Sequence, residues 1–202
     1  MCVLAFFFIR MLRGDEILSS IYIYDGPFEK GEKGYDLIRQ AAVRYCGEAG
    51  VDYPVLEAEI LREDKGKPYF VDIPLEFSLS HSGALWMCMV SQQPCGLDLQ
   101  YVKDCKYEEI ARRLFTKEEQ HYVELWGQEG FFDVWVRKEA LCKCTGQGIF
   151  SDMPSVADRN SNLLGTVAWN DREYFFTEIE IAPDIKCAAC TDDEAQVVIR
   201  VL

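Results

Sequence analysis

The central β-strands are predicted by residues 77–102, which read FSLSHSGALWMCMVSQQPCGLDLQYV. A first strand leads into a Ser-His-Ser-Gly turn and a long apolar strand, and Ser91–Pro94 then reverses the chain. Cys95–Val102 is predicted as the next strand. We therefore expect a hairpin whose second arm carries Asp98.

The segments before this region predict two strands and a helix. Cys2–Met11 is apolar and rich in Phe, and Ile21–Tyr24 alternates Ile and Tyr, so both are predicted as strands. In Lys33–Cys46 apolar residues recur at three- and four-residue spacing and Gly47 follows, which predicts an amphipathic helix with a glycine cap. A turn is expected at Gly66–Pro68.

The segments after this region predict helices and then strands. Tyr107–Gly146 is dominated by helix formers, with interruptions at Thr116 and Gly127–Gly130, which predicts three helices. The polar stretch 151–162 predicts a loop, and further strands are expected at Leu164–Trp169, Glu173–Ile181 and Val197–Leu202. Strands and helices are mixed without a regular β-α-β period, so the predicted class is α+β.

Composition excludes several classes of protein. The 202 residues are 49% hydrophobic and 27% charged, as in ordinary globular chains. Twenty-one Lys and Arg against 34 Asp and Glu give a net charge of −13, which argues against a nucleic-acid or anionic-membrane partner. The apolar run Cys2–Ile9 is far shorter than the roughly 20 residues that span a bilayer. Nine scattered cysteines do not form a disulfide framework, so we expect a cytoplasmic protein.

Two polar clusters can carry chemistry. Positions two apart on a strand share a face, so Asp98 and Gln100 point the same way. Glu139 and Lys143 lie four apart on a helix and share a stripe, beside Lys138. A solvated strand face and an exposed ion pair explain each cluster without any function. Together, however, the two carboxylates suit Mg²⁺, which takes one or two protein carboxylates and phosphate oxygens, and the lysines suit those phosphates.

The two histidines and the cysteines indicate less. His81 lies beside Ser80, where hydroxyls, an imidazole and turn amides can gather around an anion, although a capped turn explains the same pattern. Their side chains diverge on a strand, which argues against a Ser-His-Asp hydrolase. His121 is expected on a helix surface. A zinc site is disfavoured, because two of its four cysteines lie about 200° apart on a helix; the four are Cys142, Cys144, Cys187 and Cys190.

Four motifs follow one another in a recognisable order: GKPY at 66–69, FSLSHSG at 77–83, GLDL at 96–99 and FDVWVRKEALCKCTGQG at 132–148. Their order and spacing resemble those of the 4′-phosphopantetheinyl transferase superfamily, and most closely its longer, surfactin-synthetase-activating (Sfp-like) type. The resemblance implies an α+β fold of two similar α/β subdomains, at residues 1–95 and 96–202. These would form an intramolecular pseudo-dimer with the active site between them.

The resemblance also implies a reaction. The 4′-phosphopantetheine group of coenzyme A would be transferred to a serine of an apo acyl or peptidyl carrier protein, with Mg²⁺, and 3′,5′-ADP would leave. Asp98, Glu139 and Gln100 match the metal positions, and Glu139 also matches the residue that deprotonates the serine. Lys138 and Lys143 match lysines near the pyrophosphate. Further contacts to coenzyme A are implied for Ser80, His81, Gly66, Lys67 and Pro68.

The chain departs from the family pattern at two places. Gln100 stands where a second acid is common, and Tyr35 and Asp36 stand where long members carry arginine. The net negative charge also requires a local basic or apolar patch for an acidic carrier protein. The expected protein is a monomeric transferase. The alternative is a non-catalytic coenzyme A-binding or scaffold protein that retains the fold.

Overall fold

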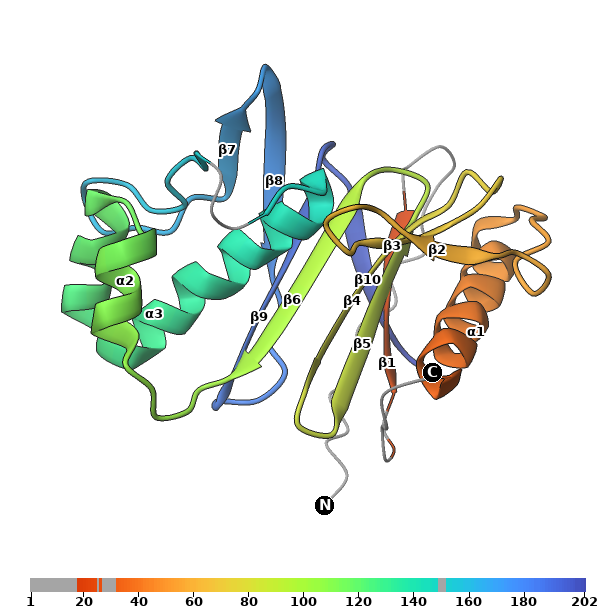
Figure 1. Ribbon diagram of the computed structural model, residues 1–202, viewed down its shortest axis with the longest axis horizontal. Coiled ribbons are helices and arrows are strands. Elements are labelled where there is room, and N and C mark those ends of the chain that lie inside the picture. The colour runs from red at the N-terminus through yellow and green to blue at the C-terminus, as the bar shows by residue number, and fades with distance from the viewer. Residues whose placement is uncertain (1–17, 25, 27–31, 149–151) are drawn as a thin grey trace.

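The computed structural model describes residues 18–24, 26, 32–148 and 152–202, which form two four-stranded sheets, a small hairpin and three helices (Figure 1). The elements are β1 (Leu18–Tyr24), α1 (Glu32–Ala49), β2 (Ile60–Arg62), β3 (Pro68–Phe70), β4 (Glu76–Ser82), β5 (Leu85–Ser91), β6 (Cys95–Tyr101), α2 (Tyr107–Leu114), α3 (Lys117–Thr145), β7 (Thr166–Trp169), β8 (Arg172–Glu178), β9 (Ile185–Thr191) and β10 (Gln196–Val201). The expected α+β class is confirmed. No helix of the described residues is long and apolar enough to cross a membrane.

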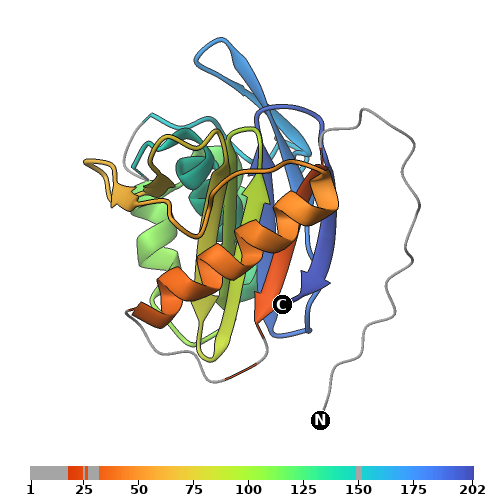
Figure 2. The ribbon, with the colours of Figure 1, turned by 90° about the vertical axis from the view of Figure 1, so that its right-hand side faces the viewer.

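The first sheet has the order β10-β1-β5-β4, and α1 lies diagonally across one of its faces (Figure 2). Successive side chains of a strand point to opposite faces. Tyr22 and Trp86 therefore pack in the cluster that contains the apolar stripe of α1, whereas Ile21 and Met87 pack in a second cluster on the opposite face. That second cluster also contains Leu97 and other residues of β6 and β9, so the first sheet lies between α1 and the second sheet.

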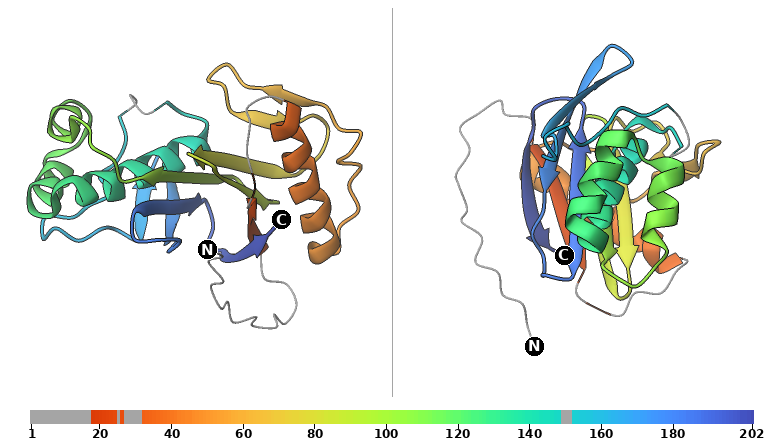
Figure 3. Two further views of the ribbon diagram at one scale, coloured as in Figure 1. Left: turned by 90° about the horizontal axis from the view of Figure 1, so that it is seen from below. Right: turned by 90° about the vertical axis from the view of Figure 1, so that its left-hand side faces the viewer.

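The second sheet has the order β6-β9-β8-β7, and α3 covers its outer face. Seen from below, α1 lies at one end of the molecule and α2 and α3 at the other (Figure 3). Gly96 allows α3 to approach β6 closely, because a Cβ atom at that position would lie 1.9 Å from the Ala140 carbonyl oxygen and 2.5 Å from the Cys144 nitrogen. Contact with β6 therefore fixes the position of the α3 backbone around Ala140.

The two halves of the chain repeat one topology. In the first half, β1 and α1 are followed, after the β2–β3 hairpin, by the antiparallel strands β4 and β5. The last of these, β5, lies between β1 and β4. In the second half, β9 lies between β6 and β8 in the same way. The division into subdomains at residues 1–95 and 96–202 stays a prediction. The final strand, β10, belongs to the first sheet, where it runs parallel to β1.

The edges of the two sheets meet where β4 lies beside β6. Serine hydroxyls of β4 accept hydrogen bonds from backbone N–H groups of β6: Ser78 from Leu97 at 2.9 Å and Ser80 from Leu99 at 3.1 Å. Ser82 accepts in the same way from the Tyr101 N–H group at 3.3 Å. Because the residues involved alternate on both strands, the contacts continue along the whole junction. We call this junction the seam.

Helix α3 is two helical arms rather than one rod. Gly127 has φ 62° and ψ −141°, which a residue with a side chain rarely adopts, and it separates residues 117–126 from 128–145. The Glu119 and Lys138 side chains touch across the break, although 19 residues of straight helix would place them about 28 Å apart. The second arm therefore folds back along the first, and the three helices predicted from Tyr107 to Gly146 are confirmed.

Several predictions about strands and turns need correction. Ser80, His81 and Ser82 lie within β4 rather than in a turn, because the chain reverses only after Ser82, at Gly83 (φ 57°). β6 does not form a hairpin with β5, since its ladder partner is β9. The glycine that follows α1 in the left-handed conformation is Gly50 (φ 69°) and not Gly47.

Other predictions of elements have mixed outcomes. The strand at Ile21–Tyr24, the Lys33–Cys46 helix and the Gly66–Pro68 turn are confirmed within a few residues. The three expected C-terminal strands correspond to β7, β8 and β10, but β2, β3 and β9 were not predicted. The strand expected at Cys2–Met11 lies outside the described residues.

The close approach at Gly96 makes a prediction about stability. Gly96→Ala forces the α3 backbone away from β6, since a backbone carbonyl cannot turn aside as a side chain can, and should lower the free energy of unfolding by at least about 2 kcal/mol. Gly47→Ala is the matched control. Its Cβ atom would meet nothing within 4 Å, and alanine favours the helix by about 0.5–1 kcal/mol. Urea unfolding measures both, and equal stability of the two variants would contradict the expectation.

Candidate active site

A cavity of about 350 Å³ opens between the β2–β3 hairpin, β4 and the end of α3. The hairpin contributes Gly66 to its wall, in a turn with φ 90°, and α3 contributes Glu139. Gly146, which ends α3 in the left-handed conformation, lies so close to the hairpin that its Cβ atom would be 2.9 Å from a Glu63 carboxylate oxygen. Both halves of the chain therefore build this cavity.

The cavity is positive in a negative protein. Its lining contains four cationic side chains and one carboxylate, Glu139; the cations are Arg62, Lys65, Lys67 and Lys143. Lys67 is paired with Glu76 at 3.2 Å. Burial opposes its charge, but the Glu76 carboxylate outweighs that effect and raises the pKa of Lys67. Cations gathered in a concave site favour a ligand with several negative charges, such as one carrying phosphates.

Asp98 lies at the seam behind this cavity, with only 3% of its surface exposed. Its Oδ1 atom accepts hydrogen bonds from the Ser80 hydroxyl at 2.8 Å and from the Lys143 ammonium at 2.7 Å. Its Oδ2 atom accepts from the Gln100 amide at 3.3 Å. The prediction that Asp98 and Gln100 share a face of the strand is confirmed, although that face meets α3 and not water.

Lys143 connects the two halves of the protein at this point. Besides Asp98, its ammonium donates to the Leu97 carbonyl oxygen on β6 at 2.9 Å and to the Leu79 carbonyl oxygen on β4 at 3.3 Å. An ammonium group has three N–H bonds, and three acceptors from both sides of the seam receive them. The amine is therefore held at the junction while its side chain also lines the cavity.

Glu139 lies one turn before Lys143 and completes the cluster. Burial raises the pKa of the Glu139 carboxyl and the negative charge of Asp98 raises it further, while Lys143 opposes the shift. Two partly buried carboxylates that repel each other suit a divalent cation. No group of three or more His, Cys, Asp or Glu side chains able to hold a metal occurs among the described residues. Two carboxylates are nevertheless the usual protein share of a Mg²⁺ site that phosphate oxygens complete.

The structure brings together some of the predicted site residues and not others. Asp98, Gln100, Glu139 and Lys143 form one cluster, and the turn with Gly66, Lys67 and Pro68 lines the adjoining cavity. Ser80 is buried in the seam, bonded to Asp98, and His81 lies half-exposed on β4; neither is part of the cavity lining.

Lys138 does not join this cluster. Its ammonium binds the Glu119 carboxylate at 3.0 Å, and the two side chains are 2% and 0% exposed. His121 is exposed, as expected, and lies 3.5 Å from Glu124.

Sequence reasoning missed three contributors to the site. Arg62 and Lys65 line the cavity from the hairpin that was not predicted, and Gln147 lines it beyond the end of α3. Arg62 and Lys65 could have been found from the sequence, since basic residues gather just before the Gly66 turn in an otherwise acidic chain. The partner of Lys138, Glu119, was also missed, because it lies in a different helical arm.

The cysteines do not form a zinc site. Cys187 and Cys190 are three residues apart on β9, so they face opposite sides of the sheet and pack in different core clusters. The eight cysteines of the described residues are free thiols, and seven of them are buried. They serve as small apolar side chains in the core.

Part of the chain is similar to a known protein family. Residues 94–190 match the family model described as the 4′-phosphopantetheinyl transferase superfamily. This segment contains β6, both arms of α3 and all but the last residue of β9, and therefore Asp98, Glu139 and Lys143. The resemblance seen in the motifs is confirmed by this match, which covers just under half of the chain.

Three curated 4′-phosphopantetheinyl transferases are similar to part of this chain. The 4′-phosphopantetheinyl transferase gsp of Aneurinibacillus migulanus is 28% identical over 136 residues, covering 64% of this chain and 56% of the relative. The 4′-phosphopantetheinyl transferase Sfp of Bacillus subtilis is 28% identical over 138 residues, covering 63% and 60%. The enzyme HetI of Nostoc is 30% identical over 141 residues, covering 63% and 56%. The match thus spans little more than half the length of these relatives.

The raised pKa of Glu139 predicts that this carboxylate costs stability. A folded-state pKa above the usual value of 4.5 means that the folded protein binds the proton more tightly than the unfolded chain. Stability therefore falls as pH rises through the unfolded and then the folded pKa. We expect Glu139→Gln to raise the melting temperature at pH 7, and the gain to vanish at about pH 4 and below.

Thermal unfolding followed by circular dichroism at the two pH values measures this effect. Glu124→Gln, an exposed glutamate of the first α3 arm, is the control and should change the melting temperature little at either pH. A Glu139→Gln variant that is no more stable than the parent at pH 7 would show that burial does not penalise this charge.

Proposed function

We propose that this protein transfers the 4′-phosphopantetheine group of coenzyme A to a serine of an apo acyl or peptidyl carrier protein and releases 3′,5′-ADP. The observation that carries the proposal is the position of Asp98, Glu139 and Lys143 at the edge of a cationic cavity, within the segment that matches the superfamily. The named activity of the relatives supports the same reaction.

In this proposal the cavity binds coenzyme A through its phosphates. Arg62, Lys65 and Lys67 surround the Gly66 turn, where they can neutralise a nucleotide phosphate, and Pro68 offers an apolar surface beside it. The Lys143 side chain lines the opposite wall, from which its positive charge can act on the pyrophosphate. His81, half-exposed on β4, is proposed as a further phosphate contact.

The chemical step uses Glu139 and Lys143, which lie on successive turns of α3. Glu139 accepts the proton of the carrier serine while the serine oxygen bonds to the phosphorus that carries pantetheine. The bond from that phosphorus to the bridging oxygen breaks, and 3′,5′-ADP leaves with its electron pair. Lys143 stabilises the negative charge that develops on the phosphate oxygens. Mg²⁺ bound by Asp98 and Glu139 would neutralise charge on the pyrophosphate.

Gln100 is the residue that distinguishes the alternative function from the proposed one. A coenzyme A-binding or scaffold protein without turnover is favoured by the glutamine at a position where an acid is common, since one charge is missing beside Asp98. The complete Asp98, Glu139 and Lys143 cluster favours the enzyme. As part of the same proposal the protein is a monomer and acts in the cytoplasm. The free thiols of the described residues suit that location.

Intact-mass spectrometry tests the proposal directly. Apo carrier proteins of the fatty-acid, polyketide and nonribosomal-peptide types are incubated with the protein, coenzyme A and Mg²⁺. Transfer adds about 340 Da to the carrier, and the gain should disappear without Mg²⁺ or with Glu139→Gln. Coenzyme A binding without a mass gain on any carrier would support the non-catalytic alternative, and the absence of both would refute the proposal.

A second experiment concerns Gln100. Gln100→Glu adds a carboxylate beside Asp98, so the Mg²⁺ concentration that gives half-maximal transfer should fall several-fold. Gln100→Ala is the control, because it removes the hydrogen bond to Asp98 without adding charge. A Mg²⁺ requirement that is unchanged or higher in Gln100→Glu would place this residue away from the metal.

A further inference from the structure

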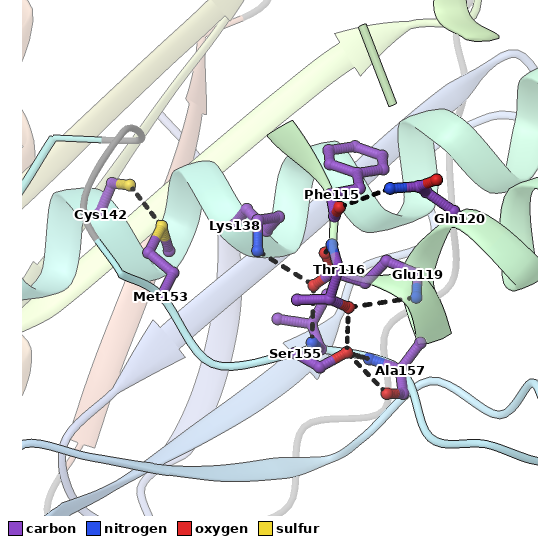
Figure 4. A network of polar contacts seen from close by, with 10 residues as sticks. Phe115, Thr116, Glu119, Gln120, Lys138, Cys142, Met153, Ser155 and Ala157 are labelled. Carbon is purple, nitrogen blue, oxygen red and sulfur yellow. Dashed lines mark hydrogen bonds and ion pairs between the residues drawn. The ribbon is translucent and has the colours of Figure 1, made fainter. Parts of the chain in front are cut away.

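The most deeply buried charges near the site are Lys138 and Glu119 (Figure 4). Their side chains are 2% and 0% exposed, and the ammonium lies 3.0 Å from Glu119 Oε1. Lys138 immediately precedes Glu139 but points to the other side of α3, since consecutive residues are about 100° apart around a helix. A lysine that resembles a phosphate contact by its motif is therefore already bound to a carboxylate.

The Glu119 carboxylate joins three segments of the chain. Its Oε1 atom accepts from Lys138 in the second α3 arm and from the Val156 N–H group at 2.9 Å. Its Oε2 atom accepts from the Thr116 N–H group at 2.8 Å, and the Thr116 hydroxyl in turn accepts from the Glu119 N–H group. Both oxygens of the carboxylate therefore accept hydrogen bonds within the protein, as a buried charge requires.

The segment held by this carboxylate is residues 152–157, which we call the strap. Ser155 lies 2.9 Å from the Thr116 hydroxyl and donates to the Ala157 carbonyl oxygen at 2.8 Å. Met153 contacts the Cys142 sulfur at 3.4 Å. The strap is thus fixed to α3 at two levels, beside Lys138 and one turn later beside Cys142.

The second of these levels belongs to the cavity of the candidate site. Cys142 lines that cavity together with Glu139 and Lys143, and Met153 covers its thiol from the strap. Lys138 and Met153 also line a second cavity, on the side of Thr116 and Trp169. The strap therefore lines the second cavity and, through Met153, contacts a residue that lines the first.

We propose that Lys138 is a positioning residue that acts through Glu119: the pair fastens the strap to α3 and so shapes the cavity that binds coenzyme A. This inference rests on the proposed function for its ligand. An ammonium that turned to a phosphate would leave Glu119 buried without a counter-charge, which is strongly unfavourable. Lys143, at the seam, supplies the cation that faces the ligand.

The test is a double-mutant cycle with Lys138→Met, Glu119→Gln and the double variant. Lys138→Met leaves the Glu119 charge buried and unpaired, so we expect coenzyme A to bind at least fivefold more weakly and the Val156 amide to lose its protection from hydrogen exchange. Glu119→Gln in addition removes the unpaired charge and keeps an oxygen for Val156. The double variant should return to within about threefold of the parent affinity and regain the protection.

Lys143→Met supplies the matched control, because this lysine lines the cavity and does not touch Glu119. Its loss of coenzyme A affinity should be the same with and without Glu119→Gln. Calorimetry measures affinity on samples whose circular dichroism shows a folded chain, and mass spectrometry measures the exchange of Val156.

Two outcomes would overturn the inference. If the double variant regains protection at Val156 but binds coenzyme A as weakly as Lys138→Met, then Lys138 touches the ligand directly. If Lys138→Met keeps both affinity and protection, then the pair positions nothing. If the parent protein itself does not bind coenzyme A, the proposed function fails, while loss and rescue of protection at Val156 still support the attachment of the strap.

Discussion

The serine hydroxyls of β4 hold the two halves of this protein in register. Each accepts a hydrogen bond from an alternate N–H group of β6, so a shift of one residue between the strands would break every contact. Ser80 has a second role, since it also donates to Asp98. Lys143 then closes the seam by donating to a carbonyl oxygen on each strand. The first half therefore contributes the Ser80 hydroxyl and the Leu79 carbonyl oxygen to a cluster whose Asp98, Glu139 and Lys143 come from the second half.

The distribution of charge separates the candidate site from the rest of the surface. A chain with a net charge of −13 gathers four cations around one cavity, and places Glu139 where burial and the charge of Asp98 raise the pKa of its carboxyl. Such a carboxylate is poorly stabilised by its own protein, which leaves it available to a metal or a proton. A phosphate ligand brings negative charge toward the cations, and a divalent cation relieves the carboxylates. The proposed ligand, a metal-bound pyrophosphate, would satisfy both the cations and the carboxylates of the site.

Periodicity predicted α1 well, because this helix buries an apolar stripe at helical spacing, and helix-forming residues with interruptions at Thr116 and Gly127 predicted the helices that follow Tyr107. It failed for β9, whose sequence IKCAACT has small buried residues on both faces and so no alternation. Periodicity also failed to assign β6 to its sheet, because the partner of a strand depends on the tertiary structure and not on the strand's own pattern. In the site, the sequence motif placed Asp98, Glu139 and Lys143 correctly side by side, but Lys138 has a partner from a folded-back arm that spacing along a straight helix does not suggest.

The second arm of α3 is held on three sides at the level of the site. Gly96 lets its backbone lie directly on β6, Lys143 ties it to the seam, and Lys138 ties it to Glu119 and the strap. Glu139 lies between these attachments, so the part of the helix that carries it is held beside β6. The proton acceptor of the proposed reaction would benefit from a fixed helix, because the reacting atoms then require less ordering. The rigidity of the helix is thus part of the chemistry that the cluster can perform.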